Sequence, residues 1–342
     1  MKRQGNPIQT VLVTGGAGYV GSVLVPRLLS KGYAVKVLDL YLFDEDPLSS
    51  VKDNPHLTEI KGDIRDQALL KKELRGCDAV IHLACISNDP SFELNPALSR
   101  VINYDAFEPL VRISKESGVK RFIYASTSSV YGISTAENVA EDHPLVPVSD
   151  YNKYKGLCEP VLLKYQSDDF VPVIIRPATI CGYSPRQRLD LTVNILTNHA
   201  VNTDKMTVFG GLQMRPNLHI EDMVDLYLLL LSLPNKRIAG KTYNAGYQNR
   251  TIADMAALVR GVVQQEMPEK KNLQIVTTPS DDKRSYHISS EKIKRELNFI
   301  PKRTIEDAVR DLVRAFRANK IPNSMSDDRY YNIKTMKGLR LV

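Results

Sequence analysis

Short runs of apolar, mostly β-branched residues alternate with longer amphipathic stretches along the first half of the chain. The runs lie at residues 10–14, 34–38, 58–61, 79–83, 121–126 and 171–176. The stretches with helical periodicity lie at 22–31, 96–117 and 152–166. Several runs are almost wholly apolar, as strands covered by helices on both faces must be. The pattern predicts an α/β fold with a parallel sheet built from βαβ units.

The alternation weakens after residue 176. A helix at 220–233 and a strand at 241–245 are expected to return to the main sheet, whereas 182–215 and 252–319 read as helices and loops. The chain is therefore divided into a main domain and a smaller mixed domain. The main domain takes 1–178, with 217–248 returning, and the smaller one takes 179–216 and 249–321. The polar tail, 322–342, is expected to be a C-terminal arm that lies on a neighbouring molecule or is partly disordered.

Composition narrows the class of protein. The 342 residues are 43% hydrophobic and carry 46 basic and 39 acidic side chains, a net charge of +7 that suits a soluble globular protein. The basic residues are dispersed, which favours a site for small anionic molecules over a nucleic-acid surface. The apolar stretch at 223–233 is broken by Asp225 and falls short of the roughly 20 residues that a membrane helix needs. Neither nucleic acid nor a membrane is expected as a partner.

The N-terminus and the cysteines point to a cytoplasmic protein. The opening residues include basic side chains but no apolar segment typical of a signal peptide. The four cysteines show no CxxC spacing and no clustering with histidines, so neither a metal site nor a disulfide framework is expected.

A glycine-rich turn follows the first predicted strand. The sequence TGGAGYVGS places Gly15, Gly18 and Gly21 where a strand passes into a helix, an arrangement that lets a pyrophosphate approach the backbone. The second strand ends in Asp39, about 20 residues further on, where a carboxylate can accept both hydroxyls of a ribose and repel a 2′-phosphate. NAD is therefore predicted rather than NADP. Asp63, in GDIRD, could receive the adenine amino group or simply cap a helix.

Tyr151 and Lys155, in YNKYK, lie four residues apart and so share one face of the predicted helix. A free tyrosine has a pKa near ~10 and is a poor base at neutral pH. A neighbouring ammonium group together with the positive nicotinamide ring would favour the phenolate and lower the pKa of the tyrosine. Tyr154 is not chosen, because it lies only one residue from Lys155.

The motifs GxxGxxG, GDIRD, HLA, YASTSSVYG and YNKYK, in this order, resemble those of the extended short-chain dehydrogenase/reductases, and in particular the NAD-dependent nucleotide-sugar epimerase/dehydratase family. The resemblance covers roughly residues 8–310. It implies a Rossmann-type, doubly wound parallel sheet that binds NAD and a smaller mixed C-terminal domain that binds a nucleoside-diphosphate sugar. It also implies a homodimer formed through the helices at 96–117 and 152–166.

The resemblance also assigns roles to individual residues. It implies catalytic roles for Thr127, Tyr151 and Lys155. It implies cofactor contacts for Gly15, Gly18, Tyr19, Val20, Asp39, Asp63, Ile64, Leu83, Ala84, Tyr151 and Lys155. It implies substrate contacts for Ser87, Ser129, Thr179, Arg215 and Arg284. Asn103 resembles an asparagine that supports the active-site strand through backbone hydrogen bonds, and His82 is expected to be structural.

The chain departs from the family pattern in the loop under the sugar. Relatives commonly read RPxNVYGP, whereas this chain reads RPATICGYS, with Thr179 and Cys181 in place of the usual Asn and Tyr. These changes leave the sugar and the nucleotide open. Cys181 is expected to be a small buried hydrophobic residue rather than a chemical group.

The favoured function is an epimerase of the 4-epimerase type, in which a transient keto sugar turns over in the pocket. The alternative is a net dehydrogenase or reductase. A 4,6-dehydratase is disfavoured because related dehydratases carry an Asp-Glu pair where this chain has Ser128 and Ser129. A non-catalytic Rossmann protein is disfavoured by the intact set of Thr127, Tyr151 and Lys155.

Overall fold

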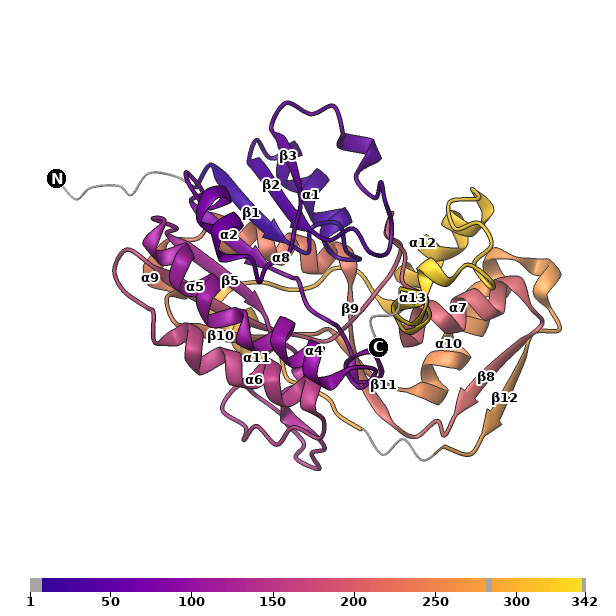
Figure 1. The fold of residues 1–342 in the computed structure, drawn as a ribbon. Coiled ribbons are helices and arrows are strands. Elements are labelled where there is room, and N and C mark those ends of the chain that lie inside the picture. The colour runs from indigo at the N-terminus through magenta and orange to yellow at the C-terminus, as the bar shows by residue number, and fades with distance from the viewer. Residues whose placement is uncertain (1–7, 281–284, 340–342) are drawn as a thin grey trace.

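A parallel sheet of seven strands forms the centre of the computed structural model, which describes residues 8–280 and 285–339 (Figure 1). The strand order is β10-β6-β5-β4-β1-β2-β3. The strands are β1 (Thr10–Thr14), β2 (Ala34–Asp39), β3 (Leu57–Lys61), β4 (Ala79–His82), β5 (Arg121–Ala125), β6 (Val171–Pro177) and β10 (Lys241–Ala245). Six of them lie within two residues of the predicted runs, and β10 returns to the sheet as expected.

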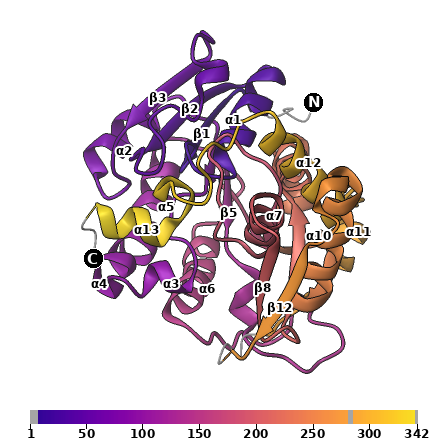
Figure 2. The ribbon, with the colours of Figure 1, turned by 90° about the vertical axis from the view of Figure 1, so that its right-hand side faces the viewer.

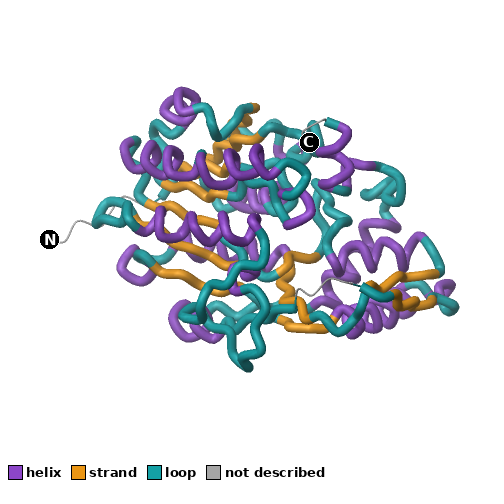
Figure 3. Tube along the Cα trace, turned by 60° about the horizontal axis from the view of Figure 1, so that its bottom comes forward, coloured by secondary structure: helices purple, strands orange, loops and turns teal. Residues whose placement is uncertain are grey.

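Helices lie on both sides of the sheet (Figure 3). Alternate residues of the strands face opposite helix layers, so an apolar core forms on each face of the sheet. Val11 and Val13 of β1 point to the layer that contains α1 (Gly21–Ser30), α8 (Ile220–Ser232) and α11 (Glu291–Leu297). Leu12 points to the layer of α2 (Gln67–Glu73), α5 (Phe107–Glu116) and α6 (Asp150–Leu163). The doubly wound Rossmann-type architecture predicted from the sequence is confirmed.

The smaller part contains strands that the sequence analysis did not predict. β7 (Thr179–Cys181), β9 (Met214–His219) and β11 (Gln248–Thr251) form one sheet, and β8 (Lys205–Phe209) pairs in parallel with β12 (Gln274–Thr278). The helices α7 (Thr192–Asn202), α10 (Ile252–Glu266) and α12 (Ile305–Arg317) pack together beside them (Figure 2). The expectation of helices and loops alone was therefore wrong for this part of the chain.

The stretch predicted as a single helix at 96–117 is divided. It consists of α4 (Pro96–Arg100), a π-helical turn (Val101–Asp105) and α5. Phe107 and Leu110 pack into the core beneath the sheet, whereas Val101 is 39% exposed. The sequence alone could not show which face of this segment points inward. The structure shows that it is the face that carries Phe107 and Leu110.

The C-terminal tail packs against its own chain, not as an arm extended towards a neighbour. After α12 it turns back across the molecule to α13 (Asn332–Gly338), which lies beside α3 (Asp89–Phe92) (Figures 1 and 2). Ile321 and Tyr330 are buried against Leu189 and Leu312, and the N–H of Leu189 donates to the carbonyl of Tyr330. Across the described ranges, no helix is long and apolar enough to cross a membrane.

Candidate active site

A cavity of 590 Å³ opens at the carboxyl ends of the main strands, where ligands bind in open α/β sheets. Its walls come from the glycine-rich turn, the segments after β2 to β6, helix α6, the loop after β7 and helix α13. Most of the predicted site residues line it: Gly15, Gly18, Tyr19, Val20, Asp39, Asp63, Ile64, Leu83, Ala84, Ser87, Thr127, Ser129, Tyr151, Lys155 and Thr179. The fold therefore gathers into one cavity residues that lie up to 164 positions apart in the sequence.

The glycine-rich turn brings backbone close to backbone. Gly15 has a φ of +73°, and a Cβ at this position would lie 2.6 Å from the backbone nitrogen of Ala84. A Cβ on Gly21 would lie 2.4 Å from the carbonyl oxygen of Gly16. Both positions therefore require glycine, and this close packing of the turn leads directly into the start of α1, where a pyrophosphate can bind.

Asp39 joins the end of β2 to the glycine-rich turn. Its Oδ2 accepts the backbone N–H of Ala17 at 3.0 Å, and its Oδ1 accepts that of Tyr41 at 2.9 Å. Burial raises the pKa of this carboxyl, while these two backbone donors oppose the shift. Each carboxylate oxygen retains a further lone pair for a ribose hydroxyl.

Asp63 is held by the neighbouring arginine rather than by a helix N-terminus. Nε of Arg65 donates to Oδ1 of Asp63 at 3.0 Å and Nη2 donates to Oδ2 at 2.6 Å, and this pairing lowers the pKa of Asp63. The N-cap of α2 is Asp66, whose Oδ1 accepts two backbone N–H groups. The helix-cap alternative for Asp63 is therefore wrong, and its contact with adenine stays a prediction.

The hydroxyl, phenol and ammonium groups expected to act on the sugar come from two adjoining elements. Thr127 is the second residue after β5, and Tyr151 and Lys155 lie on the first two turns of α6. The Oγ of Ser129 lies 2.7 Å from the Oγ1 of Thr127 and also donates to Oδ1 of Asn152, on α6. These contacts fix the segment after β5 against the helix that carries Tyr151.

Burial raises the pKa of Tyr151, with a further contribution from Asp89, and the Arg188 guanidinium opposes it. Lys155 donates from Nζ to the carbonyl of Ala125 and lies 4.5 Å from the ring centroid of Tyr124. In the protein alone the phenol is therefore the favoured form. Lowering its pKa through Lys155 and a nicotinamide ring stays a prediction about the loaded site.

The segment after β4 is supported in the way the sequence analysis expected. Oδ1 of Asn103 accepts the N–H of Ile86 at 2.8 Å, and its Nδ2 donates to the carbonyl of Ile86 at 2.9 Å. These two bonds fix the backbone next to Ser87. His82 lies behind the segment, 3% exposed, with Nδ1 at 2.7 Å from Oγ1 of Thr14. His82 is thus a structural residue.

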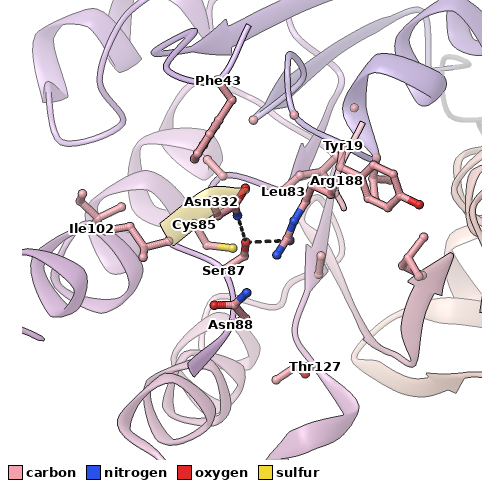
Figure 4. Close-up of a pocket in the computed structure, with 18 of the residues that line it drawn as sticks. Tyr19, Phe43, Leu83, Cys85, Ser87, Asn88, Ile102, Thr127, Arg188 and Asn332 are labelled. Carbon is pink, nitrogen blue, oxygen red and sulfur yellow. Dashed lines mark hydrogen bonds between the residues drawn. The ribbon is translucent and has the colours of Figure 1, made fainter. Parts of the chain in front are cut away.

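Two buried arginines that the sequence analysis did not identify enter the cavity from the loop after β7. The guanidinium of Arg186 lies 4.2 Å from the ring centroid of Phe43, and its Nη2 donates to Asn332. Arg188 donates from Nε to Asp190. Its Nη1 donates to Ser87, the bond drawn in Figure 4. Nε of Arg186 and Nη2 of Arg188 are buried without a hydrogen-bond partner among the described residues.

The sequence carries a signal for these arginines. The run PRQR at 185–188 follows directly after the unusual loop RPATICGYS, so two basic residues stand next to the segment expected under the sugar. Only the fold shows that both are buried and not on the surface.

The remaining predicted residues lie elsewhere. Arg215, on β9, stacks 5.1 Å from the ring of Tyr286 and donates to the carbonyl of Met214, so that Tyr286, not Arg215, reaches the cavity wall. Its contact with substrate phosphates stays a prediction. Arg284 lies outside the described residues. Cys181 is 1% exposed, within the apolar core of the smaller part, as expected.

The chemistry of the cavity wall suits a dinucleotide. The glycine turn at Gly15 and the buried donors of Arg186 and Arg188, which have no hydrogen-bond partner among the described residues, fit an anionic ligand such as a pyrophosphate. Within residues 8–280 and 285–339, no group of three His, Cys, Asp or Glu side chains could hold a metal ion.

Comparison with known proteins places the chain in a family. Residues 11–246 match the model of the NAD dependent epimerase/dehydratase family. The chain belongs to this family. The predicted family, the enzyme class and the use of NAD are thereby confirmed.

Relatives within the family catalyse different reactions. The chain is 29% identical to a UDP-glucose 4-epimerase of Lactobacillus helveticus, over 74% of this chain and 82% of that protein. It is 28% identical to UDP-glucuronic acid decarboxylase 1 of Arabidopsis thaliana, over 92% of this chain and 71% of that protein. The structure of DesIV, a dTDP-glucose 4,6-dehydratase of Streptomyces venezuelae with NAD bound, superposes with a TM-score of 0.81 at 25% identity, covering 93% of this chain and all of that one. The family therefore does not decide among epimerase, decarboxylase and dehydratase.

Proposed function

We propose that this protein is a nucleoside-diphosphate-sugar 4-epimerase that works through a transient keto sugar. The observation that carries the proposal is the set of side chains that line one cavity. Thr127, Tyr151 and Lys155 all line it, and the two residues after Thr127 are serines. This set can remove a proton from a sugar hydroxyl and return it. Bound NAD supplies the hydride acceptor and donor for this chemistry.

The chain's own residues divide the work of proton transfer. The Tyr151 oxygen takes the proton of the sugar hydroxyl as the carbonyl forms and gives it back after the keto sugar has turned. Thr127 positions the same sugar oxygen, because its hydroxyl contacts Ser129, which in turn donates to Asn152 on the helix that carries Tyr151. The Lys155 ammonium, four residues along the same helix, is expected to favour the phenolate once NAD is bound.

The acids in the cavity argue against elimination. Among the described residues, the lining carboxylates are Asp39, Asp63 and Asp89. The first two belong to the end of the cavity nearest β2 and β3, and Asp89 accepts a hydrogen bond from Ser149 at the start of α6. A dehydratase needs an acid and a base beside the outer carbons of the sugar, and the serines after Thr127 cannot replace them.

The use of NAD distinguishes an epimerase from a dehydrogenase. The loop after β7 and helix α13 line the cavity together with the main domain. An epimerase restores the oxidation state of its cofactor in each turnover, whereas a dehydrogenase must exchange it, so the amount of NAD consumed separates the two functions.

We also propose that the protein is a cytoplasmic homodimer. Val101 and Leu157 are 39% and 40% exposed on the helical segments expected to pair. All four cysteines are free thiols, which suits a reducing compartment. Analytical ultracentrifugation of wild type and of Val101→Glu tests the dimer, with a shift to monomer expected for the variant.

A product assay tests the activity. The purified protein is incubated with a panel of UDP-, dTDP-, GDP- and CDP-sugars and catalytic NAD, and the products are analysed by mass and NMR. We expect an epimer of unchanged mass. Loss of two hydrogens with stoichiometric NADH would show a dehydrogenase, and loss of carbon dioxide or water would show a decarboxylase or a dehydratase.

A further inference from the structure

The C-terminal segment, defined here as residues 321–339, forms part of the wall of the cavity in its own chain. Asn332 and Met336, on α13, line the cavity and are each 3% exposed. The segment is anchored along its length, because Tyr331 donates from its hydroxyl to the carbonyl of Ser324 and receives a hydrogen bond from Asn198 of α7. It is therefore a built part of the site, although it lies outside the residues that match the family model.

Asn332 connects three parts of the site. Its Nδ2 donates to the Oγ of Ser87 at 3.1 Å, its Oδ1 accepts from Nη2 of Arg186 at 2.6 Å, and its backbone N–H donates to Asp190 at 3.1 Å. Asp190 in turn accepts from Nε of Arg188. One amide side chain thus ties the segment after β4 to the arginine-bearing loop after β7.

These contacts determine what the Ser87 hydroxyl can do. A serine hydroxyl has two acceptor lone pairs and one donor hydrogen. Both lone pairs are used, one by Asn332 and one by Nη1 of Arg188 at 2.9 Å, and Figure 4 shows the two groups approaching Ser87 from different sides. The remaining capacity of Ser87 is to donate its hydrogen into the cavity. The unpartnered Nη2 of Arg188 adds a second donor close by.

We propose that Asn332 is a positioning residue for the sugar, which acts by holding Ser87 as a donor to an acceptor oxygen of the bound substrate. The proposal rests on the proposed nucleotide-sugar function. Without the Asn332 amide, one lone pair of Ser87 is released, its hydroxyl can turn away from the cavity, and Arg186 loses its acceptor. The sugar is then bound less tightly, while the proton-transfer groups stay in place.

The test is a double-mutant cycle on Asn332→Ala and Ser87→Ala, read out as substrate KM, kcat and calorimetric affinity for the nucleotide sugar. We expect each single variant to raise KM about tenfold with kcat changed by less than about threefold, the loss expected for one hydrogen bond. The double variant is expected to resemble the single variants, because Asn332 acts through Ser87.

Two variants control for structure. Lys337→Ala changes an exposed side chain on the same helix and should leave all three quantities unchanged. Asn332→Leu keeps the branched shape of the side chain but removes its donor and acceptor, so it should reproduce the rise in KM. Because Arg186 loses its acceptor in both Asn332 variants, the melting temperature of each is measured and KM is determined at a temperature where both are folded.

The outcomes separate this proposal from the proposed function. An unchanged KM in both Asn332 variants, or effects of Asn332→Ala and Ser87→Ala that multiply, would overturn the positioning role. A protein that binds a nucleotide sugar but does not epimerise it contradicts the proposed function alone, since the affinity cycle can still be measured. A protein that binds no nucleotide sugar contradicts both.

Discussion

The carboxylate of Asp39 accepts the backbone N–H of Ala17, with 3.0 Å between the nitrogen and Oδ2. The contact spans the end of β2 and the middle of the glycine-rich turn, so one side chain shapes the turn and faces the expected ribose. Cofactor choice and the conformation of the turn are therefore coupled at this residue.

Asp39→Ala is expected to reduce the preference for NAD over NADP. The wild-type carboxylate repels a 2′-phosphate, and the variant removes that repulsion. Affinity for NAD should also fall, because the variant leaves the N–H groups of Ala17 and Tyr41 without their acceptor. Fluorescence titrations with NADH and NADPH measure both effects. A wild-type protein that prefers NADPH would contradict the assignment of Asp39.

Tyr151→Phe is expected to abolish turnover while NAD binding and folding are retained, because the change removes one hydroxyl needed for proton transfer. Tyr154→Phe is the matched control on the same helix. Its ring packs against Phe92 and Tyr104, at centroid distances of 5.8 and 5.4 Å, and it does not contribute to the cavity wall. If Tyr151→Phe keeps more than about a tenth of the wild-type rate, corresponding to about 1.4 kcal/mol of barrier or less, another base must act.

Thr127→Val is expected to slow turnover without abolishing it. The variant keeps the shape of the side chain but removes the hydroxyl that positions the sugar oxygen. It also removes the acceptor of the Ser129 N–H, 3.2 Å away, so a modest loss of stability should accompany the slower rate. Steady-state kinetics and thermal melting of the same preparation separate the two effects. A wild-type rate would rule out a role for this hydroxyl in the reaction.

Stability is expected to fall in acid partly because of His82. Burial lowers its pKa from 6.5 to about 3. Between these values the unfolded chain binds a proton that the folded protein does not, so the free energy of unfolding falls by about 1.4 kcal/mol for each pH unit below 6.5. The contribution of His82 to stability is complete above pH 6.5 and has been lost once the pH falls below about 3.

Urea unfolding of wild type and His82→Asn between pH 4 and pH 7 tests this dependence. The difference in stability between the two proteins should shrink as the pH falls, because the asparagine does not titrate. The carboxylates titrate equally in both proteins and cancel in the comparison. His56→Asn, at an exposed histidine, is the control and should show no such trend. Parallel curves for wild type and His82→Asn would show that His82 is not the group responsible.

Strands and site residues could be predicted from the sequence where a local hydrophobic pattern or a family motif marks them. β1 has the predicted boundaries because its apolar run is typical of a buried parallel strand, and β10 also lies where it was predicted although its sequence, KTYNA, is mixed. Asn103 was also predicted correctly, since its position relative to the segment after β4 repeats a family arrangement. The π-helical turn that carries it was not predicted, because helical periodicity continues through residues 96–117.

The parts that could not be predicted depend on contacts distant in sequence. β7 has three residues, and it is a strand because it pairs with β9, which begins 33 residues later. Arg186 and Asn332 are 146 positions apart, and neither has a local pattern that distinguishes a cavity wall from a solvated surface. The tail is polar and was therefore expected to be an arm, but a few apolar residues, including Ile321 and Tyr330, are enough to dock it.

Dehydratase activity is expected to be absent, and introducing its acids should not create it. Ser128 is 2% exposed, and the Ser129 hydroxyl is engaged by both Thr127 and Asn152. Ser128→Asp with Ser129→Glu would bury two carboxylates and break these contacts, so we expect a lower melting temperature and no elimination. Mass analysis of products from wild type and the double variant is the measurement. A product lighter by one water from the wild-type protein would contradict both this prediction and the proposed function.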